Sequence, residues 1–232
     1  MGHPQIKAAV LLRALFALLL CATTLASVKV GAENKVVAVG VGDSIGTSRL
    51  DLGVDYTQST FPPNGDPQAV ARAETVAHQV AQYQNLPIFG WGSANPEPSP
   101  GVYDWSDLDR RMAIIRTTGG IPVITLCCAP DWMKGGVAGS TVWANLTKAP
   151  LSEHFGDFAE LARQIALRYP DVKHYQIWNE FKGFWSGAKS RVDYEAYTEL
   201  YNRIYDVLKS ISPDIEIGGP YAPMATELAP KD

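Results

Sequence analysis

The sequence predicts an α/β fold in which parallel strands are covered by helices, and three observations support this prediction. Short apolar runs of strand length alternate strictly with longer stretches whose apolar residues recur at helical spacing. The chain of 232 residues is 46% hydrophobic and 19% charged, which is enough to bury one core. No phosphate-binding glycine fingerprint accompanies the alternation, which favours a (β/α)8 TIM barrel over an open doubly wound sheet.

Five strands and four helices are predicted in alternation. Each strand is a short apolar run ended by Gly, Pro, Asn or a polar loop. The strands span residues 50–57, 86–92, 122–128, 172–179 and 216–219. The helices between them span residues 68–84, 106–118, 155–169 and 193–211.

The predicted helices each carry one apolar stripe. In the first helix Val76, Val80 and Tyr83 fall together, so we expect this face to be buried against the sheet. Asp193 stands where it can cap the fourth helix. Helices with a single buried stripe fit the outer layer of a barrel.

The predicted barrel is incomplete. A complete barrel has eight βα units in about 250 residues, whereas about five strands and four helices are visible here. We therefore expect residues 33–232 to form a single domain that is truncated on its C-terminal side. The two open edge strands of such a domain are expected to bind another copy, to aggregate or to leave the domain unstable.

The N-terminus has the pattern of a secretory signal. Lys7 and Arg13 precede the apolar residues 14–22, and small residues follow at Thr24 and Ala26. The apolar stretch is shorter than the about 20 residues that span a bilayer, so a cleaved leader is favoured over an uncleaved anchor. We expect a signal peptide over residues 1–26, with cleavage possible as late as residue 32, and a secreted protein with no membrane contact after its removal.

Charge and cysteine content exclude several classes of function. The net charge is -4, so no basic field attracts nucleic acid or anionic lipid. After loss of the leader only Cys127 and Cys128 remain, and neighbours in a strand point to opposite faces, so no structural disulfide is expected. The four histidines have no ligand spacing. No metal and no cofactor are predicted.

Glu180 is the residue whose position most strongly suggests chemistry. It closes the run Tyr175-Gln176-Ile177-Trp178-Asn179-Glu180, at the C-terminal end of the fourth strand, where barrel enzymes carry their catalytic groups. Alternation places Gln176, Trp178 and Glu180 on the barrel side and directs Asn179 away from Glu180. The two neighbours would serve one site only if the strand end is irregular. A solvated loop acid or a helix cap is the other interpretation of Glu180.

Aromatic residues at the strand ends point to a sugar. Trp91, Trp132, Trp178 and Trp185 follow the second, third and fourth strands, and flat rings on one barrel face would form a stacking cleft, although each ring could instead fill a core contact. Glycoside hydrolysis needs one carboxyl group to protonate the leaving oxygen and a second to attack carbon or activate water. The other acids near strand ends, Asp55, Glu97 and Asp131, are interpreted as loop, turn or helix-start acids.

The motifs together resemble the retaining glycosidases of clan A, and among them glycoside hydrolase family 39, the β-xylosidase and iduronidase group. The resemblance covers nearly all of the chain from about Leu50 onward. It rests on Gly90-Trp91-Gly92, on residues 96–109 from Pro96 to Asp109, on Pro122-Val123-Ile124-Thr125-Leu126, on Ile177-Trp178-Asn179-Glu180 and on Ile217-Gly218-Gly219-Pro220.

The resemblance implies roles for two residues. Glu180 falls on the general acid and base of the clan, and Asn179 on the residue that binds the sugar 2-hydroxyl. The clan's nucleophile is a Glu at the end of strand seven, which has no counterpart before Asp232. Phe181 stands where many relatives have Pro, which bears on the subfamily more than on the chemistry.

The resulting hypothesis is a retaining glycosidase acting on a plant-type or related polysaccharide or oligosaccharide. The 232-residue chain by itself is expected to be nearly inactive. Two alternatives remain open: a non-catalytic carbohydrate-binding protein that keeps the aromatic cleft, and an inactive fragment. The first would bind sugar independently of Glu180 and through Trp91 or Trp185.

Overall fold

A computed structural model describes residues 46–47, 50–55 and 65–220 of the chain. The chain divides into two units, Met1–Ser48 and Arg49–Asp232. Only two described residues belong to the first unit, so the predicted signal peptide lies outside the described residues.

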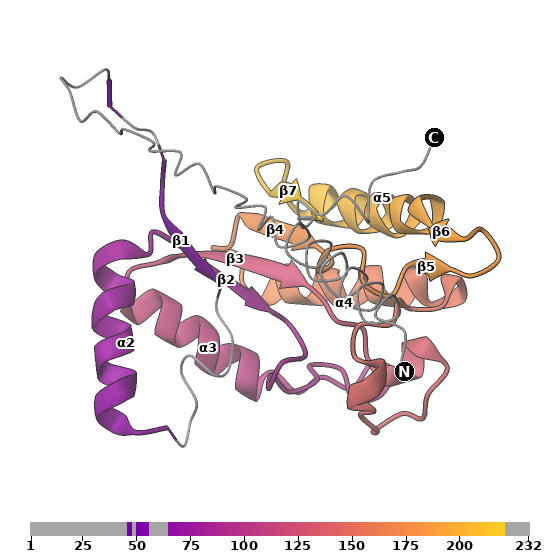
Figure 1. The fold of residues 1–232 in the computed structure, drawn as a ribbon, viewed down its shortest axis with the longest axis horizontal. Coiled ribbons are helices and arrows are strands. Elements are labelled where there is room, and N and C mark those ends of the chain that lie inside the picture. Colours follow the sequence, from indigo (N-terminus) through magenta and orange to yellow (C-terminus); the bar gives the residue numbers. More distant parts are fainter. Residues whose placement is uncertain (1–45, 48–49, 56–64, 221–232) are drawn as a thin grey trace, which may run out of the picture. The chain divides into compact units, whose positions relative to one another are not determined.

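The second unit is built on a five-stranded parallel sheet in the order β1-β2-β3-β4-β7 (Figure 1). The register aligns Gly53 with Tyr83 and Tyr83 with Ile121. The strands are β1 (Gly53–Asp55), β2 (Tyr83–Pro87), β3 (Ile121–Leu126), β4 (His174–Ile177) and β7 (Glu216–Gly218). Because all neighbours are parallel, every strand ends at the same edge of the sheet. The predicted α/β architecture with five barrel strands is confirmed.

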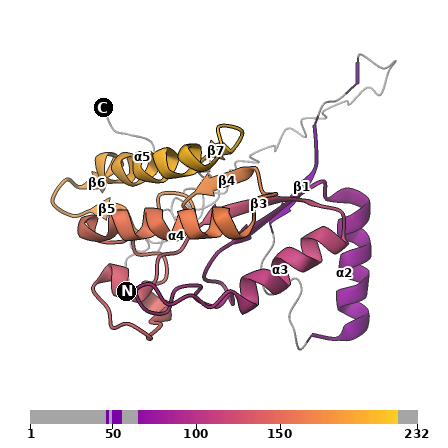
Figure 2. The same ribbon diagram turned by 180° about the vertical axis from the view of Figure 1, so that it is seen from behind.

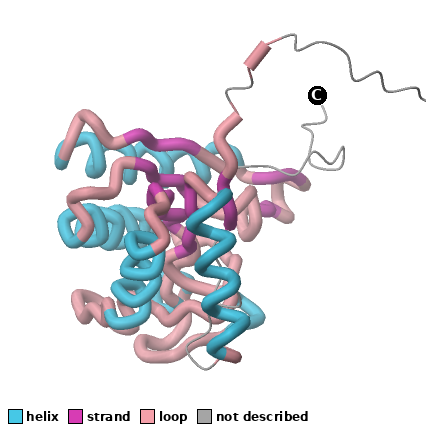
Figure 3. The backbone as a smooth tube through the Cα atoms, turned by 90° about the vertical axis from the view of Figure 1, so that its left-hand side faces the viewer, coloured by secondary structure: helices cyan, strands magenta, loops and turns pink. Residues whose placement is uncertain are grey.

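Four helices follow the strands, as predicted: α2 (Pro67–Val80), α3 (Ser106–Thr117), α4 (Phe155–Arg168) and α5 (Tyr194–Ile211). Strands β2 and β3 lie in front of α3 and α4 in Figure 1 and behind them in Figure 2. The side view of Figure 3 has α2 nearest the viewer, in front of the strands. Asp193 caps α5 by accepting a hydrogen bond from the N–H of Ala196 at 3.1 Å, which confirms the sequence prediction.

The first helix and the second strand differ from their predicted bounds. Helix α2 ends at Val80 rather than at residue 84, and β2 begins at Tyr83 rather than at residue 86. Val76 and Val80 are exposed, whereas Ala77 is buried. Tyr83 belongs to the strand because it pairs with both Gly53 and Ile121, so its helical spacing from Val76 and Val80 is coincidental.

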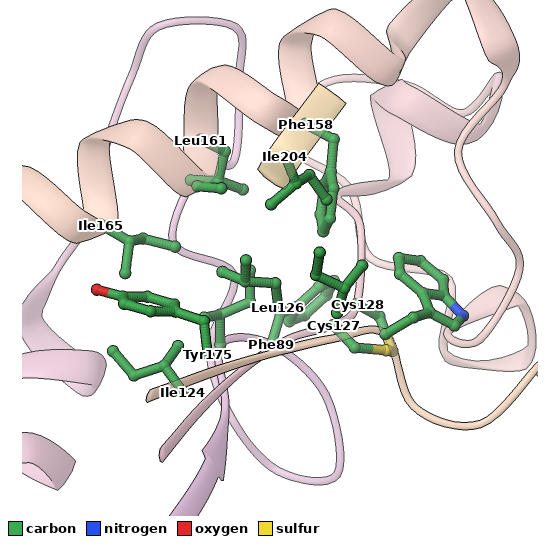
Figure 4. Packing of buried hydrophobic residues seen from close by; sticks show 14 of the residues in the cluster. Phe89, Ile124, Leu126, Cys127, Cys128, Phe158, Leu161, Ile165, Tyr175 and Ile204 are labelled. Carbon is green, nitrogen blue, oxygen red and sulfur yellow. A yellow bond between two sulfur atoms is a disulfide. The ribbon is translucent and has the colours of Figure 1, made fainter. Parts of the chain in front are cut away.

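The core lies between the sheet and the helices. Figure 4 shows Ile124 and Leu126 of β3 and Tyr175 of β4 close to Phe158, Leu161 and Ile165 of α4. All six side chains are buried, and Ile124, Leu126, Phe158, Leu161 and Ile165 leave almost no accessible surface. Burial of apolar area at this helix and sheet interface is the main source of stability.

Cys127 and Cys128 form a disulfide with each other, which corrects the expectation that they remain unpaired (Figure 4). The expectation assumed that both residues lie in a strand and alternate. Strand β3 ends at Leu126, so the alternation no longer applies to the two cysteines. Both are fully buried.

Loops at the C-terminal edge of the sheet carry short elements that were not predicted. The loop after β3 contains the 3-10 helices η1 (Asp131–Lys134), η2 (Trp143–Asn145) and η3 (Ser152–His154). The loop after β4 contains an antiparallel hairpin of β5 (Trp185–Ser186) and β6 (Arg191–Val192). Within the described ranges, no helix is long and apolar enough to cross a bilayer.

Candidate active site

A pocket of about 200 Å³ opens at the C-terminal edge of the sheet. Four of the five strands, or the loops that directly follow them, contribute to its walls. Its lining consists of Asp55, Asn85, Pro87, Trp91, Thr125, Asn179 and Lys182. Ligand sites in barrels occupy this edge, so the pocket is the natural candidate for the active site.

The pocket has a polar floor built from two neighbouring strands. Thr125 on β3 donates its hydroxyl hydrogen to Oδ1 of Asn85 on β2 at 2.8 Å. Register places Thr125 opposite Pro87, two residues beyond Asn85. Hydroxyl and amide groups that point into a barrel interior can bind the hydroxyls of a small polar ligand.

The end of β4 turns sharply instead of continuing as a strand. The last strand residue is Ile177, and both Trp178 and Glu180 have left-handed backbone conformations, with φ of 67° and 59°. Such backbone angles are strained in non-glycine residues and are concentrated at functional sites. The strand end is therefore irregular, which is the condition under which Asn179 and Glu180 can serve one site.

Glu180 adjoins the pocket through Lys182. The Lys182 ammonium, which lines the pocket, lies 3.0 Å from Oε2 of Glu180, and the Glu180 side chain is partly exposed. Asn179 is almost fully buried and lines the pocket directly. The structure thus brings together Asn179, Glu180 and Lys182 at the end of β4.

Trp178 does not offer a stacking surface, contrary to its predicted place in the cleft. Its side chain is fully buried, with edge-to-face contacts to Phe158 at 5.7 Å and to Phe184 at 5.5 Å between ring centroids. Its indole N–H donates to the carbonyl oxygen of Lys182 at 2.7 Å. Trp178 is therefore a core residue that supports the turn carrying Glu180 through this hydrogen bond.

The other predicted aromatics are divided between the pocket, the rim and the interior. Trp91 lines the pocket and is partly exposed. Trp185 is 66% exposed on β5, in the hairpin that follows Glu180. Trp132 lies in η1, packs against His154 and donates its indole N–H to the carbonyl oxygen of Glu97, which is not a pocket contact.

Of the three further acids, Asp55 alone lines the pocket. Asp131 is buried in an ion pair with Lys134. Glu97 is 4% exposed, accepts a hydrogen bond from the N–H of Gly101 at 2.9 Å, and its Oε2 has no hydrogen-bond partner among the described residues. Burial raises the pKa of Glu97 to about 7, and the negative charges of Asp157 and Glu160 add to this effect.

Asn85, Thr125, Lys182 and Asp55 were not assigned to the site from sequence. A usable signal was present for Thr125, because it is a polar residue inside an otherwise apolar strand. Asn85 gave none, because it falls between the predicted helix (68–84) and the predicted strand (86–92). Lys182 gave no such signal, since a lysine in a loop is ordinarily solvated. Within the described parts of the chain, no group of three or more His, Cys, Asp or Glu side chains is arranged to hold a metal ion.

Solved structures of glycoside hydrolases share this fold. A monomeric β-xylosidase from Caulobacter crescentus CB15 aligns with a TM-score of 0.56 at 23% identity, over 75% of this chain and 36% of the enzyme. The GH39 enzyme from Xanthomonas axonopodis pv. citri aligns with a TM-score of 0.53 at 25% identity, over 75% and 35% of the two chains. A bacterial orthologue of human α-L-iduronidase aligns with a TM-score of 0.50 at 16% identity, over 76% and 28%.

The chain spans about a third of the length of these solved structures. No protein-family model matches the sequence, and no curated protein matches it. The structural likeness shows that the fold is that of the strand and helix units in those glycoside hydrolase barrels, which agrees with the resemblance to family 39.

Proposed function

We propose that this chain is the acid/base-bearing part of a retaining glycoside hydrolase, with Glu180 as the general acid and base. The position of Glu180 carries the proposal: a carboxylate on a strained turn at the C-terminal end of β4, beside a polar pocket with an exposed tryptophan. The neighbours named as β-xylosidases make a β-xyloside the first substrate class to test.

The chemistry assigned to Glu180 has two stages. In the first, its carboxyl proton passes to the glycosidic oxygen as the bond from that oxygen to the anomeric carbon breaks and the nucleophile's carboxylate bonds to that carbon. In the second, the Glu180 carboxylate takes a proton from the water that attacks the same carbon and displaces the nucleophile's carboxylate. The ion pair with Lys182 holds the carboxylate at the pocket in the free protein, and the leaving oxygen would replace the ammonium as its partner.

Asn179 is assigned the binding of the sugar ring. It lines the pocket next to Glu180 in sequence, and its amide can donate to one sugar hydroxyl while its carbonyl accepts from another. Trp91 on the opposite loop supplies an apolar ring face for stacking.

The nucleophile is proposed to lie outside these 232 residues, because the resemblance assigns it to a seventh strand. The pocket should then bind a xyloside without hydrolysing it in buffer. We further propose, from the leader predicted over residues 1–26, that the protein is secreted.

Formate at molar concentration tests this proposal on the purified chain. A formate oxygen attacks the anomeric carbon, and the aryl oxygen departs with the proton of Glu180. We expect no phenol release from phenyl β-xyloside in buffer and measurable release in formate. Glu180→Gln should lower the formate-dependent rate about 10²- to 10⁴-fold. With dinitrophenyl β-xyloside the Glu180→Gln variant should keep most of the formate-dependent rate, since dinitrophenolate leaves without a proton.

Two results would contradict parts of the proposal. Binding of the xyloside with no formate-dependent release from either substrate would favour a non-catalytic carbohydrate-binding protein. Release in buffer alone that Glu180→Gln abolishes would keep the acid/base role and refute the absence of the nucleophile.

A further inference from the structure

Trp143 is a large, exposed aromatic residue on the loop after β3. It begins the 3-10 helix η2 and is 57% exposed. Large aromatic rings contribute most when they are covered, so a tryptophan that is exposed on a well-held loop can serve as a surface for a ligand. The proposed function has not used this residue.

A buried ion pair holds the loop that carries Trp143. Nζ of Lys134 lies 2.9 Å from Oδ1 of Asp131, and both side chains are more than 95% buried. Lys134 also donates to the carbonyl oxygens of Asn145 at 3.0 Å and Leu146 at 3.3 Å, while Asp131 accepts a hydrogen bond from the N–H of Val142. The pair therefore holds the backbone on both sides of Trp143, at residue 142 and at residues 145 and 146.

Such a pair is costly to bury unless its hydrogen bonds are satisfied. Here the Asp131 carboxylate and the Lys134 ammonium both bond to one short backbone segment, 142–146, in which the Trp143 side chain is exposed. The arrangement pre-orders an exposed ring, and pre-ordering lowers the entropy that a ligand would otherwise lose on binding.

The Trp143 loop lies between two segments that line the pocket. On one side of the loop, the Trp143 ring contacts Phe89, with ring centroids 6.1 Å apart. Leu146 also packs tightly on Gly90: a Cβ atom added to Gly90 would lie 2.9 Å from the Leu146 side chain. Trp91, a pocket residue, follows directly.

On the other side of the loop, Gly183 approaches the backbone of residues 147–149. A Cβ at Gly183 would clash with the carbonyl oxygen of Thr147, and Gly183 accepts a hydrogen bond from the N–H of Ala149. Gly183 follows Lys182, which is the pocket residue at the end of β4. The loop is thus packed against both walls of the site.

We propose that Trp143 is an outer sugar-binding platform that stacks the unit next to the one held in the pocket, so that the ligand is an oligosaccharide. This proposal rests on the proposed function. The pocket of about 200 Å³ at the strand ends is assigned to one sugar ring. A second ring must then lie outside it, where an indole face can cover the apolar C–H face of a sugar.

Calorimetric titration of the purified chain with xylotetraose and with methyl β-xyloside tests the platform. Trp143→Ala should weaken xylotetraose binding about tenfold and leave methyl β-xyloside binding unchanged, and Trp143→Phe should keep part of the tetrasaccharide affinity. Val137→Ala is the matched control, because Val137 is 74% exposed on the same loop and should affect neither ligand. Both Trp143 variants should keep the melting temperature of the parent chain.

Three outcomes would overturn the platform. Unchanged xylotetraose affinity in Trp143→Ala, with loss of both ligands in Trp91→Ala, refutes the platform and leaves the proposed function intact. Equal weakening of both ligands by Trp143→Ala also refutes it, since the ring would then act on the pocket itself. Failure of the parent chain to bind either ligand refutes the platform together with the proposed function.

Discussion

Replacing Trp178 with alanine is expected to lower the free energy of unfolding by about 3–5 kcal/mol. The indole is fully buried between Phe158 and Phe184, so the change leaves a cavity that the surrounding aromatic rings cannot fill without moving. It also removes the hydrogen bond to the Lys182 carbonyl, which supports the turn carrying Glu180. Trp178→Phe keeps a ring and should cost less than half as much.

Urea unfolding followed by circular dichroism measures these changes. Trp185→Ala is the control, because this tryptophan lies in the same loop region but is largely exposed, and its removal should change the free energy of unfolding by less than about 1 kcal/mol. Equal effects of the two alanine substitutions would show that Trp178 is not a core residue.

The stability of the chain should fall as the pH rises from about 4.5 to about 7, because of Glu97. Its pKa is raised to about 7 in the folded protein, so the folded state binds its proton more tightly than the unfolded state does. The contribution of the protonated Glu97 to the free energy of unfolding is fully present below the unfolded pKa near 4.5, and it is lost as the pH rises through the folded pKa of about 7. The shift corresponds to a loss of up to about 3 kcal/mol.

Glu97→Gln isolates this effect. Glutamine has the same shape without the ionisation, so the free energy of unfolding of the variant should lack this part of the pH dependence. The difference in free energy of unfolding between the variant and the parent should therefore shift in favour of the variant when the pH is raised from 5 to 8. Urea unfolding of both proteins at the two pH values gives the comparison. Parallel changes in the two proteins would assign the pH dependence to other groups.

The fold was largely predictable because its signal is periodic. Alternating apolar runs and amphipathic stretches specified the order of strands and helices, and the acid that caps α5 was readable as Asp193. The predicted bounds of helices and strands were wrong where a helical pattern ran into a strand. Tyr83 fits the helical spacing of Val76 and Val80 but pairs as a strand residue with Gly53 and Ile121, a long-range contact that local spacing does not contain.

The site was predictable only as far as regular strand geometry extends. Asn179 and Glu180 were proposed from their motif, and Asn179 lines the pocket, but alternation misplaced Trp178 because the backbone turns left-handed at Trp178 and Glu180. The disulfide between Cys127 and Cys128 was missed for a related reason, since both residues lie beyond the end of β3. Departures from regular geometry depend on tertiary packing, and here they occur at the edge of the sheet that carries the pocket.

An affinity label tests most directly whether Glu180 is the acid/base carboxylate of a sugar site. In N-bromoacetyl-β-xylosylamine an electrophilic carbon occupies the place of the leaving group, so a carboxylate there forms an ester bond to that carbon and releases bromide. We predict a single adduct, located by peptide mass spectrometry at Glu180, that excess methyl β-xyloside prevents and that Glu180→Gln lacks. An adduct at another carboxylate such as Asp55, or labelling that methyl β-xyloside does not prevent, would contradict this account.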